Sequence, residues 1–433
     1  MKKSLILVSI LMMVFSMIVV VNDNVLAKDD KVTITVASVP TITALETIKG
    51  AAQRYMDAHP DVIVKVLATP KTTTERLGLY LQFFEAKSPE VDVYHIDVIW
   101  PGDLSEHLID LNKYGAREVI DQYFPAIVEN NTVDGRLVAI PHYTDGGLLY
   151  YRTDLLEKYE LEPPKTWDEL ERAARTIQAG ERAAGNEDFW GFVWQGNAYE
   201  GLTCDALEWI VSNDGGTIIS SDKKITINNS NAVEAIERAA SWVGTISPAG
   251  VVGFAEEDAR KLWQAGNAAF MRNWPYAYSL GNTEDSVIKG KFDVVPLPAG
   301  KSGTGAATLG GWQLAVSKYS KHPDIATDVA LFIASYDEQK IMAIERSLNP
   351  TIPRLYEDPD VLQATPFFGT LYHVFTNAVA RPSTATAPNY NEVSSLFFNA
   401  VHSVLTGKED AQTAIEILEL DLQELTGFEI GQP

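Results

Sequence analysis

VTITVA (residues 32–37), VIVKVL (62–67) and VDVYHID (91–97) are three short runs in which apolar residues alternate or dominate, as they do in β-strands. Between them, apolar residues recur at spacings of three and four from Ile42 to Tyr55 and from Glu75 to Lys87, which is typical of amphipathic helices. Strand, helix, strand, helix, strand is the order of an open parallel sheet with helices on both faces. The sequence therefore predicts an α/β fold.

Helix and strand signals alternate in the rest of the chain as well. Thr166-Trp-Asp-Glu169 has the pattern of a capping box, so a helix should begin there. Asn231 is expected to cap another helix that runs to about Val243. The chain has 433 residues, which is more than one hydrophobic core usually serves, and it contains no long linker or internal repeat. Two lobes would therefore be joined by several crossings of the backbone.

The start of the chain indicates export. A basic start at residues 2–3 precedes an apolar run over 4–21, and Val25-Leu-Ala27 supplies the small residues of a processing site. This order predicts a signal peptide at 1–27, although the apolar run approaches the length of a membrane anchor. No cysteine lies at the expected cleavage site to carry a lipid, so we expect a free periplasmic protein.

The charge balance argues against anionic partners. The chain carries 35 Lys and Arg against 58 Asp and Glu, a net charge of −23, so its surface repels phosphate backbones and anionic lipids. We expect no partner among nucleic acids or membrane surfaces, and a monomer. Cys204 is the only cysteine, which excludes a disulfide within the chain. It is expected to be a small buried hydrophobic residue.

The sequence contains no motif of metal, nucleotide or nucleophilic chemistry. The seven histidines form no HExxH or similar metal-ligand spacing. Gly300-Lys-Ser302 lacks the preceding glycine of a phosphate-binding loop, Gly303-Thr-Gly305 lacks the third glycine of a dinucleotide loop, and GxSxG does not occur. We therefore expect a protein that is not an enzyme and that uses no metal and no cofactor.

Aromatic and acidic residues gather instead where the chain turns. Trp312 follows two glycines, Trp274-Pro-Tyr276 contains a proline, and Tyr143-Thr-Asp145 precedes two glycines. A sugar explains this mixture, because its C–H faces stack on aromatic rings and its hydroxyls bond to carboxylates, each bond contributing about 1.5–3 kcal/mol. The expected ligand-binding residues are Arg76, Asp97, Tyr143, Asp145, Trp274, Tyr276, Gly311, Trp312 and Arg381.

Each of these residues has a structural alternative. Asp97 ends a parallel strand, where ligands bind in open sheets, but it could also cap the following turn. Trp312 could pack in a core, Arg76 could be a solvated helix charge, and Arg381 could pair with a carboxylate at an interface. Two more aromatic residues could line either a pocket or a core: Trp100 and Trp194. The tryptophans in or beside helical patterns are assigned to structure: Trp167, Trp190, Trp209, Trp242 and Trp263.

Several short motifs, taken together in their order, resemble those of a known family. They are VDVYHID (91–97), GRLVAIP (135–141), YYRTDLL (150–156), PKTWDEL (164–170), AGNAAFM (265–271), GGWQLAV (310–316) and NPTIP (349–353). No single motif is specific, but the ordered set covers nearly the whole chain after residue 27. It resembles the family 1 extracellular solute-binding proteins of ABC importers, the group that contains the maltose-binding proteins, and within it the trehalose/maltose-binding proteins most of all.

This resemblance implies a fold and a function. The fold would have two lobes joined by a hinge, each with an open, mostly parallel sheet flanked by helices. The lobe ranges would be 28–140 with 299–345, and 141–298 with 346–433. The function would be to bind a neutral sugar, such as trehalose or maltose, in the cleft and to deliver it to the membrane permease of the importer. In relatives the matching tryptophans and tyrosines stack on glucose rings, while the aspartates and arginines bond hydroxyls.

The chain departs from the relatives at its first helix. They carry an acidic ligand residue near its start, where this chain has Thr43 and Ala44, with Glu46 as the nearest carboxylate. Ala44 and Glu46 are therefore candidates only by position. Other classes also remain open. A secreted glycoside hydrolase also needs carboxylates among aromatic residues, and the ligand could be a polyol, an oligosaccharide or a peptide.

Overall fold

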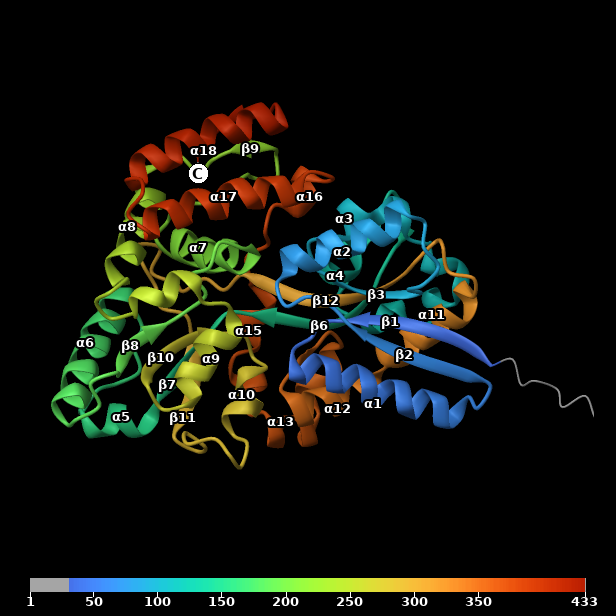
Figure 1. The fold of residues 1–433 in the computed structure, drawn as a ribbon, viewed down its shortest axis with the longest axis horizontal. Coiled ribbons are helices and arrows are strands. Elements are labelled where there is room, and N and C mark those ends of the chain that lie inside the picture. The colour runs from blue at the N-terminus through green and yellow to red at the C-terminus, as the bar shows by residue number, and fades with distance from the viewer. Residues whose placement is uncertain (1–30, 433) are drawn as a thin grey trace, which may run out of the picture.

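The computed structural model describes residues 31–432. The expected signal peptide at 1–27 lies outside the described residues. Two β-sheets lie at opposite sides of the molecule, each with helices packed around it (Figure 1). The α/β fold with two open sheets is thus confirmed. In the described part of the chain, no helix is both long enough and apolar enough to cross a membrane.

The larger sheet has six strands in the order β13-β6-β12-β3-β1-β2. Its strands are β1 (Val32–Ser38), β2 (Val62–Ala68), β3 (Val93–Asp97), β6 (Ile140–Gly146), β12 (Leu309–Val316) and β13 (Asn349–Pro350). Its main helices are α1 (Ile42–Ala58), α2 (Thr73–Glu85), α11 (Pro323–Ile333) and α12 (Tyr336–Arg346). α1 and α2 begin with threonine caps: Thr41 accepts from the amide of Ala44, and Thr72 from that of Glu75.

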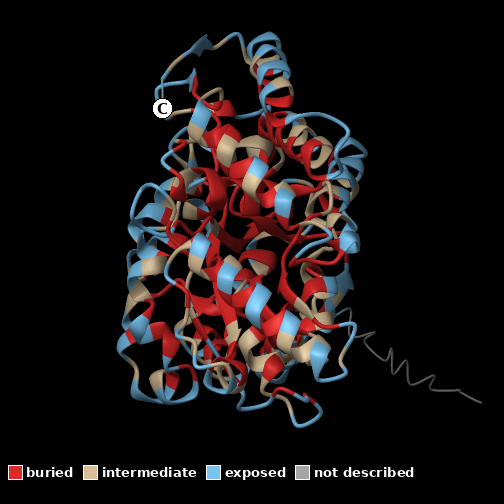
Figure 2. Ribbon diagram, turned by 90° about the vertical axis from the view of Figure 1, so that its left-hand side faces the viewer, coloured by how far each residue is buried: buried red, intermediate tan, exposed pale blue. Residues whose placement is uncertain are grey.

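The smaller sheet has four strands in the order β11-β7-β10-β8. These are β7 (Leu148–Arg152), β8 (Trp190–Val193), β10 (Ala268–Asn273) and β11 (Phe292–Pro296). The helices on this side are α5 (Thr153–Lys158), α6 (Trp167–Ala183), α7 (Glu200–Ser212), α8 (Ser230–Trp242), α9 (Glu256–Gln264), α10 (Ala277–Gly281), α17 (Tyr390–Leu405) and α18 (Ala411–Thr426). Buried residues concentrate between these helices and the strands (Figure 2).

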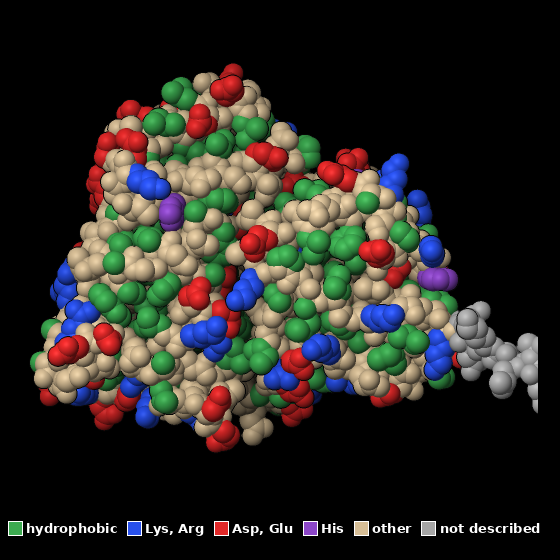
Figure 3. Space-filling model, viewed as in Figure 1, with side chains coloured by type: hydrophobic (Ala, Val, Ile, Leu, Met, Phe, Trp, Pro, Cys, Tyr) green, Lys and Arg blue, Asp and Glu red, His purple; other side chains and the backbone are tan. Residues whose placement is uncertain are grey.

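The remaining α-helices and β-strands are short. They are α3 (Pro101–Leu104), α4 (Pro125–Asn130), β4 (Thr132–Val133), β5 (Arg136–Leu137), β9 (Lys224–Ile225), α13 (Pro359–Ala364), α14 (Phe367–Thr370), α15 (Tyr372–Thr376), α16 (Ser383–Thr386) and β14 (Glu429–Ile430). On the face that Figure 3 shows, acidic and basic side chains are interspersed over both halves of the molecule.

Both sheets are mixed rather than mostly parallel. β1 is parallel to β2 and β3, and β10 is parallel to β8, as the strand-helix-strand pattern predicts. β12 is antiparallel to β3 and β6, and β7 is antiparallel to β10 and β11. β6 and β7 are consecutive in the chain but belong to different sheets, and each is antiparallel to its neighbours in its own sheet.

The backbone crosses between the two sheets at more than one place. β6 ends at Gly146 in the larger sheet and β7 begins at Leu148 in the smaller sheet, so Gly147 is the one residue that connects the two sheets there. A second crossing runs from β11 to β12, over residues 297–308. Neighbouring crossings of this kind form a hinge. The lobe ranges given above stay a prediction.

The two expected helix starts differ in outcome. The capping box is confirmed, since Thr166 Oγ1 accepts from the amide of Glu169 at 3.2 Å and Glu169 Oε2 accepts from that of Thr166 at 3.2 Å. The assignment of Asn231 as a cap is wrong by two residues. Asn229 has the extended backbone of an N-cap, and its Oδ1 accepts from the amides of Asn231 and Ala232 at 3.1 and 3.0 Å. Asn231 is already within α8.

Candidate ligand-binding site

A cavity lies between the two sheets, next to the hinge strands. On the side of the larger sheet it is lined by the ends of β3, β6 and β12 and by the first turns of α1 and α2. The opposite wall comes from α7, from the segment after β10 and from Arg381. Its volume is about 90 Å³, which is room for several water molecules. A larger ligand would therefore enter by separation of the two walls.

The structure brings all the main candidates to this cavity. They are Arg76, Asp97, Tyr143, Asp145, Trp274, Tyr276, Gly311, Trp312 and Arg381. The strand register explains part of this convergence. Trp312 lies directly opposite Asp97 on β3 and opposite Tyr143 on β6. Directly opposed residues of antiparallel strands point to the same face of the sheet. Their role as ligand contacts remains a prediction.

The other four candidates do not line the cavity. Ala44 is buried in the first turn of α1, and Glu46 is on the exposed face of that helix, where it pairs with Lys49 at 3.0 Å. Trp100 is buried behind Trp312, edge-on, with ring centres 5.7 Å apart. Trp194 lies in the core of the smaller-sheet side, and its Nε1 donates to Ser247 Oγ at 3.0 Å. The structure therefore does not bring these four residues to the cavity.

Sequence reasoning missed several residues of the lining. They are Val39, Thr41, Thr43, Lys71, Thr73, Glu200, Gly201, Cys204, Glu256, Gly310 and Leu348. A signal existed for the threonines. They follow parallel strands β1 and β2, whose carboxyl ends meet at the same edge of the sheet as that of β3. Glu200 and Glu256 had no such signal, because they begin helices on the other side of the cleft. Cys204 is buried as expected, but it lines the cavity.

The indole rings of Trp274 and Trp312 form two walls of the cavity, and an arginine side chain packs against each ring. The guanidinium of Arg76 lies 4.5 Å from the ring centre of Trp312, and that of Arg272 lies 3.9 Å from the ring centre of Trp274. Trp274 Nε1 also points to Glu256 Oε1 at 3.4 Å. Such contacts hold large rings in one orientation. The site therefore offers fixed aromatic surfaces to a ligand.

Arg381 joins the two sides of the cleft. Its Nη2 donates to Asp97 Oδ1 at 2.9 Å, and its Nη1 donates to Glu200 Oε1 at 2.8 Å. Asp97 ends β3 in the larger sheet, while Glu200 begins α7 beside the smaller sheet. Asp97 Oδ1 also accepts from the amide of Ile99 at 3.3 Å, so it both caps its turn and pairs across the cleft.

Glu200 is held from its own side as well. Its carboxylate accepts from the hydroxyls of Tyr390 and Ser394, each at 2.6 Å. Burial raises the pKa of Glu200, while the charge of Arg381 and these hydrogen bonds oppose the rise. The ion pair between Arg381 and Glu200 thus involves a buried carboxylate whose position is fixed by two residues of α17.

Buried polar atoms without a partner point to a ligand of hydrogen-bonding character. Thr43 Oγ1, Arg76 Nη1, Asp145 Oδ1 and Arg381 Nε are buried and have no hydrogen-bond partner within the described residues. An unsatisfied buried group of this kind costs about 1–3 kcal/mol. The group includes both donors and an acceptor. A ligand rich in hydroxyls can satisfy both kinds, because each hydroxyl donates and accepts.

The charges around the cavity nearly cancel. Lys71, Arg76 and Arg381 face the carboxyl groups of Asp97, Asp145, Glu200 and Glu256. Burial raises the pKa of Asp145 well above its ordinary value, and the charge of Asp97 adds to this rise. A cavity with no dominant charge suits a neutral ligand. Among residues 31–432 there is no group of three or more His, Cys, Asp or Glu that could hold a metal ion.

A buried carboxyl group lies at a second contact across the cleft. Asp103 on α3 lies near the start of α17, and both of its carboxyl oxygens are buried. Burial raises its pKa to about 7, and the charge of Glu392 adds to this, while the backbone N–H groups of Tyr390 and Asn391 oppose it. The folded protein thus holds this proton more tightly than the unfolded chain, where Asp titrates near pH 4.

The contribution of Asp103 to stability should therefore decrease as pH rises from about 4 to about 7, with the full cost present above pH 7. Asp103→Asn removes the charge, so it should raise the thermal midpoint more at about pH 8 than at about pH 5. Differential scanning calorimetry checks this, with the exposed Asp121→Asn as control. An equal effect of Asp103→Asn at both pH values would contradict the assignment.

Comparison with known proteins gives consistent matches. A family model described as bacterial extracellular solute-binding protein matches residues 40–340. A probable ABC transporter-binding protein of Deinococcus radiodurans is 54% identical over 365 residues, which cover 84% of this chain and 87% of that protein. The maltodextrin-binding protein MdxE of Bacillus subtilis is 24% identical, with 89% and 90% covered.

The fold also matches solved structures. That of T. maritima MalE3 with bound maltose has a TM-score of 0.87 and 41% sequence identity, and the match covers 91% of this chain and 100% of that chain. A solute-binding protein from Thermotoga lettingae with bound α-D-tagatose has a TM-score of 0.82 at 22% identity, covering 92% and 100%. The second likeness concerns the fold alone.

Proposed function

This chain belongs to the bacterial extracellular solute-binding proteins of ABC importers, and from that premise we propose that it captures a small neutral sugar between its two lobes. Proteins of this family bind solutes and do not transform them, so the chain is not an enzyme. One observation carries the proposal. Unpaired, buried polar atoms and two indole rings, contributed by both sides of the cleft, meet at one cavity.

A sugar fits each part of this arrangement. The C–H faces of a pyranose ring pack on the indole rings of Trp274 and Trp312. Its hydroxyls can donate to Asp145 Oδ1 and accept from Arg76 Nη1 and Arg381 Nε, the atoms that lack partners. A neutral sugar adds no charge to a cavity whose charges already nearly balance.

The ligand we propose is a glucose-containing disaccharide such as maltose or trehalose. Support comes from the MalE3 structure, which holds maltose, and from MdxE, which is named for maltodextrin. The sugar would pass to the membrane permease of an ABC importer. With a cleaved signal peptide at 1–27, the protein would act in the periplasm as a monomer.

A thermal-shift screen tests the proposed function. A ligand at about 100 times its Kd stabilises the protein that binds it by about 2.7 kcal/mol. We expect a glucose disaccharide to raise the unfolding midpoint, and mannitol and a dipeptide to leave it unchanged. A deoxy analogue of the sugar that binds should stabilise less, because it leaves a buried polar group unpaired. Stabilisation by the dipeptide alone, or by none of these compounds, would contradict the proposal.

A further inference from the structure

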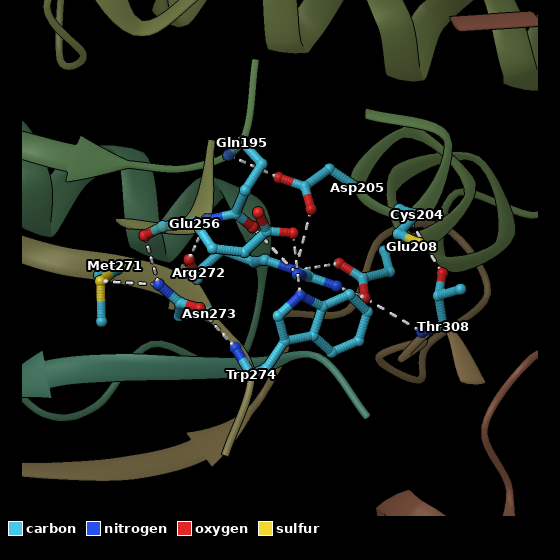
Figure 4. Close-up of polar contacts among 10 residues, drawn as sticks. All are labelled: Gln195, Cys204, Asp205, Glu208, Glu256, Met271, Arg272, Asn273, Trp274 and Thr308. Atoms are coloured by element: carbon cyan, nitrogen blue, oxygen red, sulfur yellow. Dashed lines mark hydrogen bonds and ion pairs between the residues drawn. The ribbon is translucent and has the colours of Figure 1, made fainter. Parts of the chain in front are cut away.

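We propose that Arg272 is a positioning residue, which fixes the Trp274 ring for ligand binding and links this ring to the hinge. Arg272 is itself held by ion pairs with Asp205 and Glu208. This inference rests on the proposed function, because it assigns a role within the same site. The three charged side chains are fully buried, and Arg272 does not line the cavity. Figure 4 shows them next to Trp274.

The guanidinium of Arg272 lies against the Trp274 ring. Its carbon is 3.9 Å from the ring centre, which is within stacking and cation–π distance. Trp274 lines the cavity whereas Arg272 does not, so the arginine supports the ring from the side away from the cavity. The orientation of this aromatic wall therefore depends on where the guanidinium is held.

Three side chains contact the guanidinium of Arg272. Glu208 accepts from Nε at 2.8 Å and from Nη2 at 2.5 Å, which is a bidentate pair. Asp205 Oδ1 lies 3.0 Å from Nε, and Gln195 Oε1 accepts from Nη1 at 3.0 Å. Asp205 is itself fixed, since its Oδ2 accepts from the amide of Gln195 at 2.9 Å. An arginine held by so many contacts has little freedom to move away from the ring.

The same carboxylate reaches one crossing of the hinge. Glu208 Oε1 accepts from the amide of Thr308 at 3.0 Å, directly before β12. Thr308 is also held through its hydroxyl, which donates to the carbonyl of Cys204 at 2.9 Å. Glu208 therefore contacts both the arginine beneath Trp274 and the backbone that enters the strand carrying Trp312.

The cluster also packs against the other crossing. Gly147 separates β6 from β7, and a Cβ at this position would lie 2.1 Å from Glu208 Oε1 and 2.7 Å from Arg272 Nη2. Only glycine fits there without displacing the ion pair. The buried charges thus lie where two backbone crossings meet beneath the aromatic wall. Movement at the hinge and the position of the Trp274 ring are coupled through them.

A double-mutant cycle tests the positioning role. Arg272→Lys keeps the charge but loses the planar group that stacks on indole and pairs with Glu208. We expect it to weaken maltose binding about tenfold or more in the wild type, and by less than about threefold when Trp274→Phe is already present. An equal loss in both backgrounds would overturn the inference. Arg152→Lys, at a buried arginine of β7 that pairs with Asp154 away from the cavity, should leave the Kd unchanged.

A measurement without ligand separates this inference from the proposed function. The emission of Trp274 is the difference between spectra with and without Trp274→Phe, and Arg272→Lys should shift it because the stacked guanidinium is lost. An unshifted difference spectrum would overturn the inference. If no sugar binds the wild type, the proposed function fails, and this spectrum alone decides the role of Arg272.

A neutral variant covers the case in which Arg272→Lys does not fold. Gly147→Ala leaves every charge in place, but its new methyl group would displace the side chains of Glu208 and Arg272 from the backbone at residue 147. The matched control is Gly146→Ala, whose Cβ would meet Phe375 at the milder distance of 3.2 Å. We expect Gly147→Ala to weaken maltose binding and to shift the Trp274 emission more than Gly146→Ala does. The reverse order would contradict the link to the hinge.

Discussion

Replacement of Arg381 by methionine is expected to weaken sugar binding at least about 100-fold, or about 2.7 kcal/mol. Arg381 pairs with Asp97 on one side of the cleft and with Glu200 on the other, at 2.9 and 2.8 Å. Methionine fills a similar volume but leaves two carboxylates buried without their cation. Removal of one partner from a buried pair costs about 3–5 kcal/mol. Most of that cost arises only when the cleft is closed over its ligand.

Isothermal titration calorimetry checks this result, with circular dichroism to verify the fold. The matched control is Arg152→Met, which also breaks an ion pair of a buried arginine but lies on β7, away from the cavity. That control should lower stability and leave the Kd unchanged. Normal binding by Arg381→Met would mean that the bridge across the cleft does not contribute to ligand capture.

Trp312→Ala is expected to weaken sugar binding by about 2–4 kcal/mol, or roughly 30- to 1,000-fold, because large aromatic anchors in desolvated pockets dominate such sites. Trp312 is 9% exposed and lies opposite Asp97 in the sheet, and the guanidinium of Arg76 lies 4.5 Å from the centre of its ring. Its loss removes a stacking surface and frees Arg76 from its position. Calorimetry measures the Kd. The change in intrinsic tryptophan fluorescence on sugar binding should be smaller in this variant than in the wild type.

The matched control for Trp312 is Trp242→Phe. Trp242 lies in the core of the smaller-sheet side, where its Nε1 donates to Glu171 Oε1 at 2.8 Å. Its replacement should lower the unfolding midpoint, since the donor and part of the packing are lost, but the Kd should not change. If Trp242→Phe weakened binding and Trp312→Ala did not, the assignment of Trp312 to the ligand-binding site and of Trp242 to the core would be wrong.

Much of the fold could be predicted from local patterns. The first three strands and the helices between them follow directly from apolar spacing, and the capping box at Thr166 from a local motif. The antiparallel hinge strands could not be predicted this way. The pairing of β12 with both β3 and β6 depends on contacts between residues far apart in the chain. Local apolar patterns do not encode such pairings.

The candidate site shows the same limit in its side chains. Trp100 and Trp312 both lie beside glycine or proline, yet only Trp312 reaches the cavity. Trp312 is within a strand in register with Asp97, whereas Trp100 follows the end of β3 and turns behind it. Glu46 does not reach the cavity for a related reason. The cavity meets only the first turn of α1, at Thr41 and Thr43, and Glu46 faces solvent.

Glu200 and Glu256 show what sequence reasoning lacks. Each begins a helix on the side of the smaller sheet, and neither lies near a motif typical of ligand binding. They reach the site only because the two sides of the molecule meet across the cleft, where Arg381 and Trp274 contact them. Their position depends on the packing of the lobes, which no local pattern specifies.

The central claim is that a sugar is held between the two lobes by residues of both. Without ligand, the unpaired buried atoms of Thr43, Arg76, Asp145 and Arg381 favour a cleft that opens to water, since each unsatisfied group costs about 1–3 kcal/mol. A bound sugar satisfies them and should stabilise the closed form. Small-angle X-ray scattering of one sample, before and after saturation with a sugar whose binding calorimetry has established, tests this most directly. We predict a smaller radius of gyration with sugar, and an unchanged scattering profile would contradict capture between the lobes.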